Sequence, residues 1–286
     1  MGTITGIHGI AQQYQSGPEL TSTWFDALRG GLNVAGFRAK AESLQSNDLT
    51  VAFFGDLFRP EGTMGPGREF DVSDLNSKHD RDLLEFFYEA AAGREPTIRP
   101  TEDEMGIAGG LQQMLRRLAR SKALAGIVEK LFVRDLKQVN WFLDDPDTKE
   151  RVLSRVAAEV STDTVILIGH SLGSVVAYEY LCQYQPAQVH LFVTVGSPLG
   201  IPNLVFDRLT PKPIEGRGAW PGHATRWVNV ADEDDVVALV KDLAGLFCEP
   251  AGTEFRDRLV DNGNQPHMIS RYLNSKQVGE AVGSVL

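Results

Sequence analysis

The sequence has few cysteines, little positive charge and none of the glycine-rich motifs that bind nucleotide phosphates. Its 286 residues include two cysteines, Cys182 and Cys248. They are too few for a disulfide framework, and neither has metal-ligand spacing around it. Lys and Arg total 28 against 38 Asp and Glu, a formal charge of -10, so no nucleic-acid partner is expected. Neither G-x-x-x-x-G-K-[ST] nor G-x-G-x-x-G occurs, which excludes the common nucleotide-binding loops.

Long hydrophobic runs are also absent. No stretch approaches the roughly 18 consecutive apolar residues of a membrane span. Residues 1–9 lack the basic start and apolar segment of an export signal. Together with the sparse cysteines, these features predict a cytoplasmic protein.

Short apolar runs alternate with helical patterns along the chain. The runs predict strands at 3–9, 49–55, 164–168, 190–195, 225–230 and 254–260. Helical periodicity predicts helices at 24–32, 83–88, 148–160, 175–181, 236–246 and 269–282. Alternating strands and helices indicate an α/β fold with a mostly parallel sheet covered on both faces.

A long segment separates the second predicted strand from the third. Residues 56–103 are rich in Gly, Pro and charge, and residues 107–143 keep a helical period interrupted by glycines. With no linker between two cores, the chain is expected to form a single domain, 1–286, with a helical cap insertion at about 56–147.

The motif Gly169-His170-Ser171-Leu172-Gly173 matches G-x-S-x-G. This strained turn between a strand and a helix holds a serine hydroxyl above a sheet. The strand expected at 164–168 and the helix that follows Ser171 supply that context. Ser171 is therefore the candidate nucleophile, and the alternative is a glycine-flanked serine in an ordinary turn.

A serine nucleophile needs a histidine base and an acid that orients the base. In sites built on a G-x-S-x-G turn, the three residues follow one another in the sequence in the order serine, acid, histidine. His190 and His223 precede the acidic cluster that follows the next strands, so His267 is the candidate base. The alternative for His267 is a solvated loop histidine or a residue at a helix N-terminus, and this alternative is the favoured interpretation for His190 and His223.

The candidate acid lies in Asp232-Glu233-Asp234-Asp235, directly after the strand expected at 225–230. Asp235 is favoured because the chain is expected to enter a helix at Val236 while the side chain of Asp235 turns back over the sheet. Asp232 and Asp234 remain open as alternatives. The aspartates that do not serve as the acid are expected to cap that helix.

An oxyanion requires two preorganised N–H donors. The amide of Leu172, directly after the nucleophile, is one candidate. The amide of Ile10 is the second, because Gly9 permits an unusual turn in the loop after the first strand. His8 is expected to order this loop through hydrogen bonds rather than to transfer protons.

These motifs, together with Thr194-Val195-Gly196-Ser197-Pro198-Leu199, resemble the lipase and esterase branch of the α/β-hydrolase superfamily. The resemblance covers about residues 1–55 and 148–286. Because the first strand already carries His8-Gly9, the two antiparallel strands that usually open this fold are missing. The resemblance thus implies a compact α/β-hydrolase sheet of six strands. The large insertion also comes earlier in the chain than the usual lid of the family.

The insertion is basic in an acidic chain. Residues 107–143 contain two acidic residues, Glu129 and Asp135, and seven basic ones: Arg116, Arg117, Arg120, Lys122, Lys130, Arg134 and Lys137. One interpretation is contact with an anionic lipid surface or an acidic acyl substrate. The favoured one is a cap helix with its charges in solvent. In both cases Trp141 and Phe142 are expected to help line an acyl pocket.

The resulting hypothesis is a serine hydrolase of the esterase or lipase type that cleaves a small-molecule or lipid ester through an acyl-enzyme. It requires Ser171, His267 and Asp235, and neither metal nor cofactor. A thioesterase, an amidase or an acyltransferase on the same residues stays open. So does a catalytically silent binding protein with this fold.

Overall fold

The computed structural model describes residues 3–10, 12, 14–58, 72–99, 110–118, 121 and 129–286. At its centre lies a six-stranded sheet in the order β2-β1-β3-β4-β5-β6, and every neighbouring pair is parallel. The strands are β1 (Ile4–Ile7), β2 (Leu49–Ala52), β3 (Ile166–His170), β4 (Leu191–Val195), β5 (Arg226–Asp232) and β6 (Glu254–Val260). The predicted α/β class and the six strands are confirmed, and the sheet is parallel throughout.

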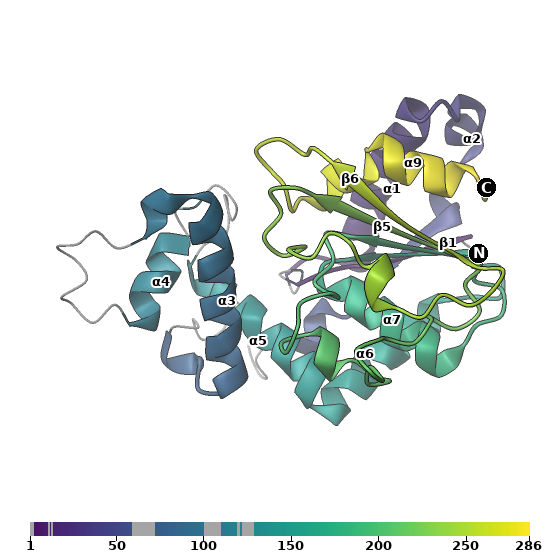
Figure 1. Ribbon diagram of the computed structural model, residues 1–286. Helices are drawn as coiled ribbons and strands as arrows, with labels where there is room; N and C mark the ends of the chain where they lie inside the picture. The colour runs from purple at the N-terminus through teal and green to yellow at the C-terminus, as the bar shows by residue number, and fades with distance from the viewer. Residues whose placement is uncertain are drawn as a thin grey trace.

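Helices cover both faces of this sheet (Figure 1). On one face lie α1 (Gly17–Val34), α8 (Ile269–Leu273) and α9 (Lys276–Gly283), and on the other lie α6 (Pro146–Glu159) and α7 (Leu172–Tyr184). Along β3, Ile166 and Ile168 belong to the same buried hydrophobic cluster as Leu28 of α1, whereas Leu167 belongs to the cluster on the other face with Val176 of α7. Successive strand residues point to opposite faces of the sheet. A strand that is apolar at every position therefore packs against the helices on both faces.

The strand order places the loops after β1 and β3 side by side. The chain moves from β1 to β2 on one side and from β3 to β4 on the other, so the order reverses at the β1–β3 pair. In open parallel sheets, ligands bind beyond the carboxyl ends of the strands at such a reversal. The loop containing Gly9 and the turn containing Ser171 both lie there.

The insertion between β2 and β3 is helical. It contains α3 (Lys78–Arg94), α4 (Leu111–Leu118) and α5 (Glu129–Asp144), and α3 packs against both α4 and α5. Figure 1 shows α3 and α4 to the side of the sheet at which the strands end, with α5 leading back to the body of the protein. A cap over the site and a single domain spanning 1–286 remain predictions.

The helix expected at 236–246 does not form, and that prediction was wrong. The segment contains only a 3-10 turn, Ala244–Leu246. The carboxylate of Asp257 on β6 accepts hydrogen bonds from the backbone N–H groups of Leu243 and Ala244, at 3.1 and 2.9 Å. Side chains from outside the segment thus satisfy backbone groups that a helix would have paired internally.

The expected capping of that helix by aspartates is therefore also wrong. The carboxylate of Asp232 instead accepts hydrogen bonds from the backbone N–H groups of Asp234 and Asn262. Asp235 accepts from the N–H of Val237 at 2.9 Å, which is a local turn rather than a helix N-cap.

The terminal helix expected at 269–282 is divided into α8 and α9. Ser275 begins α9 by accepting a hydrogen bond from the N–H of Val278 at 3.3 Å. The break packs against α1 at Gly31, where a Cβ atom would overlap the carbonyl oxygen of Leu273. Close contact between α1 and the break therefore requires a glycine.

Two expectations from composition can be compared with the described residues. Cys182 and Cys248 are both free thiols. Within the described ranges, no helix combines the length and the apolar character needed to cross a membrane.

Replacing Gly173 by alanine tests the close packing of α7 on β1. A Cβ atom at Gly173 would overlap the carbonyl oxygens of Ile7 and His8, which belong to rigid backbone. Gly173→Ala is expected to lower the free energy of unfolding by about 1 to 3 kcal/mol in urea denaturation. Gly93→Ala in α3, where a Cβ atom would meet nothing within 4 Å, is the control and should be neutral or slightly stabilising. Equal effects of the two substitutions would contradict this account.

Candidate active site

Ser171 lies in a strained turn between β3 and α7. Its backbone has φ 54° and ψ -130°, a combination that residues other than glycine rarely adopt. Glycine at 169 is required here, because a Cβ atom would lie 2.6 Å from the Cα atom of Ser174. This is the geometry that presents a serine hydroxyl above the end of a parallel sheet.

The loop after β1 lies directly beside Ser171. A Cβ atom at Gly9 would be 2.7 Å from the Cβ atom of Ser171. His8 fixes the loop: its Nδ1 donates to the carbonyl oxygen of Gly9 at 2.6 Å, and its Nε2 accepts from the N–H of Phe54 at 3.1 Å. Burial lowers the pKa of His8 to about 4, so its ring stays neutral. His8 orders the loop that carries Ile10, as the sequence analysis expected.

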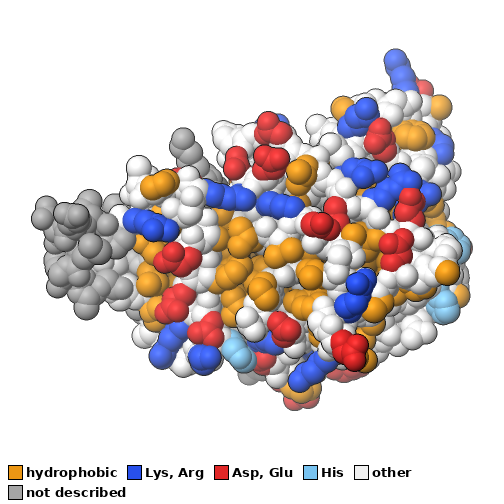
Figure 2. All heavy atoms as spheres, viewed as in Figure 1, with side chains coloured by type: hydrophobic (Ala, Val, Ile, Leu, Met, Phe, Trp, Pro, Cys, Tyr) orange, Lys and Arg blue, Asp and Glu red, His pale blue; other side chains and the backbone are white. Residues whose placement is uncertain are grey.

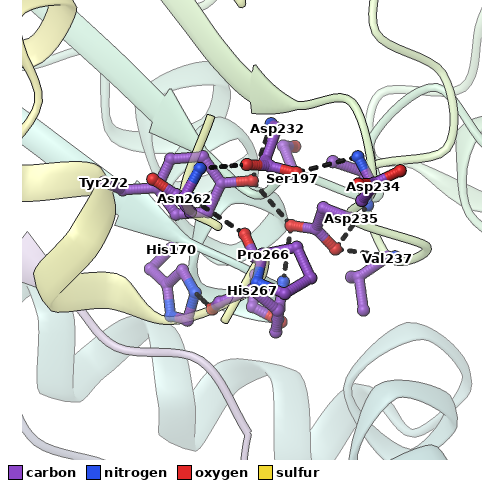
Figure 3. A network of polar contacts seen from close by, with 12 residues as sticks. His170, Ser197, Asp232, Asp234, Asp235, Val237, Asn262, Pro266, His267 and Tyr272 are labelled. Carbon is purple, nitrogen blue, oxygen red and sulfur yellow. Dashed lines mark hydrogen bonds and ion pairs between the residues drawn. The ribbon is translucent and has the colours of Figure 1, made fainter. Parts of the chain in front are cut away.

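Asp235 and His267 form a hydrogen-bonded pair (Figure 3). His267 Nδ1 lies 2.8 Å from Asp235 Oδ2, and the side chain of Asp235 is fully buried. Asp235 lies in the loop after β5, and His267 lies in the loop between β6 and α8. The structure thus brings together two of the residues singled out in the sequence.

The two alternative aspartates have other partners. The Asp232 carboxylate holds backbone N–H groups, and Asp234 is exposed, with Oδ1 3.9 Å from Arg94 Nη1 of α3. Of the three candidate aspartates, Asp235 is the one that contacts His267.

Electrostatics keep Asp235 ionised. Burial alone would raise the pKa of its carboxyl group, but the charge of His267 and the hydrogen bonds from His267 and Tyr272 outweigh burial and lower that pKa below its usual value. Lys241 supports the same loop, since its Nζ donates to the carbonyl oxygens of Asp232 and Asp235. Burial lowers the pKa of Lys241 to about 8.

His170 connects the nucleophile turn to the loop of His267. Its Nε2 donates to the carbonyl oxygen of His267 at 3.0 Å, and the two rings lie 4.8 Å apart. Burial, together with the charge of His267, lowers the pKa of His170 to about 3. Because His170 directly precedes Ser171, this hydrogen bond joins the turn of the candidate nucleophile to the loop of the candidate base.

Sequence reasoning missed three residues that hold the site. His170 occupies a variable position of the motif, and Tyr272 belongs to an apolar helical pattern. Asn262 donates from its Nδ2 to the carbonyl oxygen of Pro266 at 3.0 Å, directly before His267. No motif or spacing in the sequence indicated that these three residues belong to the site. His190 and His223 are exposed, in agreement with the favoured interpretation of these histidines.

The basic residues of the insertion lie only partly within the described residues. Arg120 and Lys122 lie outside them, and the side chains of Lys130 and Arg134 are not described. Arg117 donates to the carbonyl oxygen of Ile98 at 2.9 Å, and Lys137 donates to that of Asp74 at 2.7 Å, so these two cations bind protein groups. Arg116 is exposed.

The aromatic residues of α5 take part in packing. Phe142 is fully buried, and Trp141 stacks on Phe58 at 6.2 Å. Their place in an acyl pocket stays a prediction. Among the described residues, no three His, Cys, Asp or Glu side chains gather as a candidate metal site.

Comparison with models of protein families gives a match to part of the chain. Residues 132–216 match the model of a protein family described as "PGAP1-like alpha/beta domain". That stretch includes most of α5, all of α6, β3, α7 and β4, and Ser171 in its turn. No curated protein and no solved structure matches the chain.

The buried histidines predict how stability depends on pH. The pKa of His170 is about 3 in the folded protein against 6.5 normally, so the unfolded chain binds more protons between these values. The free energy of unfolding therefore falls as pH drops below 6.5. Urea denaturation measures the free energy of unfolding at pH 7 and at pH 4.5. Between these two values, the free energy of unfolding of His170→Gln should fall by about 2 kcal/mol less than that of the wild type.

The exposed His190 provides the control for this measurement. His190→Gln should retain the pH dependence of the wild type, because its side chain is solvated in both states. If His170→Gln also retained it in full, the neutral buried state of His170 would be refuted.

Proposed function

We propose that this chain, which carries a PGAP1-like α/β-hydrolase domain with a parallel six-stranded sheet, is a serine hydrolase that cleaves carboxylic esters. The observation that carries the proposal is the hydrogen bond between His267 Nδ1 and the buried carboxylate of Asp235. It leaves the Nε2 atom of His267 to act on Ser171, in the arrangement of a Ser-His-Asp triad.

The proposed reaction uses Ser171 and His267 in turn. Ser171 Oγ attacks the ester carbonyl carbon, and His267 Nε2 takes the hydroxyl proton. The tetrahedral intermediate collapses, the ester C–O bond breaks, and His267 returns the proton to the departing alkoxide, which leaves as an alcohol. Water then attacks the acyl carbon while His267 takes a proton from it. The bond between the acyl carbon and Ser171 Oγ breaks, His267 returns the proton to Oγ, and a carboxylic acid is released.

Asp235 and two backbone amides stabilise the charges that develop. Asp235 orients His267 and favours its protonated form without taking the proton. The amides of Leu172 and Ile10 are the proposed donors to the oxyanion. Support for Leu172 comes from its place at the start of α7, where the first N–H groups of a helix have no partner within the helix. Support for Ile10 comes from the contact of the Gly9 loop with Ser171.

The glycine at 196 also fits this proposal. It has φ 57° at the end of β4, and a Cβ atom there would lie 3.0 Å from Asp235 Oδ2 and 3.1 Å from His267 Nδ1. A side chain at this position would press on the acid and the base together. This gives a physical reason for Gly196 in the segment that resembles the α/β-hydrolases.

The insertion supports an apolar acyl group as part of the substrate. Arg94, at the end of α3, reaches the loop of Asp234 and thus brings α3 to the acid side of the site. Phe86 and Ala90 precede Arg94 by two turns and one turn on the same side of α3, and both are partly buried. Figure 2 shows hydrophobic side chains gathered on the surface between the insertion and the sheet domain. We propose that α3 covers the site as a cap and that the acyl chain binds beneath it.

Labelling with a fluorophosphonate tests the nucleophile. Intact-mass analysis should show one adduct on the wild type and none on Ser171→Ala, because the reagent phosphonylates an activated serine. Turnover of p-nitrophenyl esters of increasing acyl length then ranks the acyl site. Thioester and amide substrates run in parallel distinguish the other reactions open to the same triad. A folded wild type without an adduct would favour a catalytically silent binding protein.

Substitution of the two neighbouring aspartates tests the assignment of the acid. Asp235→Asn should lower kcat by roughly 10⁴-fold, because the amide holds His267 in the wrong tautomer. Asp234→Asn, one residue away and exposed, should change kcat by no more than about threefold. The reverse result in ester hydrolysis would assign the acid to Asp234.

A further inference from the structure

The candidate acid has a second side-chain partner besides His267. Tyr272 of α8 is fully buried, and its hydroxyl donates to Asp235 Oδ2 at 2.7 Å. The same hydroxyl accepts from the backbone N–H of Asp232 at 2.9 Å. The Oδ2 atom is thus shared between His267 and Tyr272 (Figure 3).

We propose that Tyr272 is a positioning residue, which orients the Asp235 carboxylate and limits how strongly that carboxylate stabilises protonated His267. The inference rests on the proposed function, because it assigns a role toward the acid and base of that reaction. The hydroxyl does not touch the ester in this account and acts through Asp235.

The four hydrogen bonds on the carboxylate fix its plane. Oδ1 accepts from the N–H groups of Val237 and Ala238, at 2.9 and 3.4 Å. Oδ2 accepts from His267 and Tyr272. Removing the tyrosine hydroxyl would free one side of Oδ2 and leave the N–H of Asp232 without this acceptor.

Tyr272 remains a donor throughout the working pH range. Burial and the negative charge of Asp235 both raise the pKa of its phenol above the usual value. A hydrogen bond from a neutral hydroxyl draws negative charge toward itself and away from His267. Without it, Asp235 stabilises protonated His267 more strongly, and a higher pH is needed to produce the free base.

Other charged and titratable groups lie around Asp235, Tyr272 and the residues that contact them, and they come from several elements. They are His8 after β1, Arg94 of α3, His170 of β3, Asp232 and Asp234 at the end of β5, and Lys241 in the following loop. With pKa values of about 4 and 3, His8 and His170 are neutral above pH 5, and Lys241, with a pKa of about 8, keeps most of its charge below pH 7. The acid limb, which is the part of the profile where kcat/KM rises with pH, is therefore measured between pH 5 and pH 7.

Tyr272→Phe tests the proposal, because it removes the hydroxyl and keeps the ring. We expect the acid limb of kcat/KM for ester hydrolysis to move to higher pH by roughly 0.5 to 1 unit, and kcat at the plateau to fall about tenfold. The matched control is Tyr178→Phe, which removes another buried hydroxyl that donates to the carbonyl oxygen of Ala219 at 3.0 Å. Its pH profile should coincide with that of the wild type.

A second variant keeps the test decisive if Tyr272→Phe does not fold. Replacing Tyr272 with 3-fluorotyrosine retains the hydroxyl and makes it a stronger donor, so the acid limb should move to lower pH. An unchanged acid limb in a folded Tyr272→Phe, or in the fluorinated protein, would reduce Tyr272 to a packing role and overturn the inference.

Fluorophosphonate labelling separates this failure from failure of the proposed function. If the wild type and the Tyr272 variants are all labelled at Ser171 and their acid limbs coincide, the inference alone is wrong. If the folded wild type is not labelled, the proposed function is wrong, and the role of Tyr272 is refuted with it.

Discussion

The structure of the site depends on the need to hold one ionised carboxylate away from water. A buried charge is unfavourable unless hydrogen bonds replace its hydration. The two oxygens of Asp235 accept four, from the loop after β5, from His267 and from α8. Segments far apart in the sequence therefore meet at this side chain.

Much of the fold and of the site could be predicted from local sequence, and the failures share a cause. Six short apolar runs predicted six strands, because a parallel sheet buries both faces of each strand. The segment 236–246 has apolar residues at helical spacing, but Asn229 of β5 and Asp257 of β6 bind its backbone groups, and no local pattern reveals these partners. Tyr272 was missed for the same reason, since its phenol looks like one more apolar position of a terminal helix until β5 is placed beside it.

Side-chain contacts join the helices between β2 and β3 to the loops of the central sheet. Arg208, in the loop after β4, lies 2.6 Å from Asp144 of α5 and donates to Asn140 Oδ1 at 2.9 Å. At the other end, Arg94 of α3 faces Asp234. Ion pairs of this kind, partly exposed, are individually weak. They nevertheless place α3 and α5 against loops that follow β4 and β5, which are the strands on the acid side of the site.

The most direct test is a crystal structure of the protein after reaction with a fluorophosphonate. The account predicts phosphorus bonded to Ser171 Oγ, with the phosphoryl oxygen at hydrogen-bond distance from the amides of Leu172 and Ile10. His267 Nε2 should lie beside the adduct, with Nδ1 still on Asp235. An adduct on another residue, or a phosphoryl oxygen turned away from both amides, would contradict the proposed acyl-enzyme chemistry.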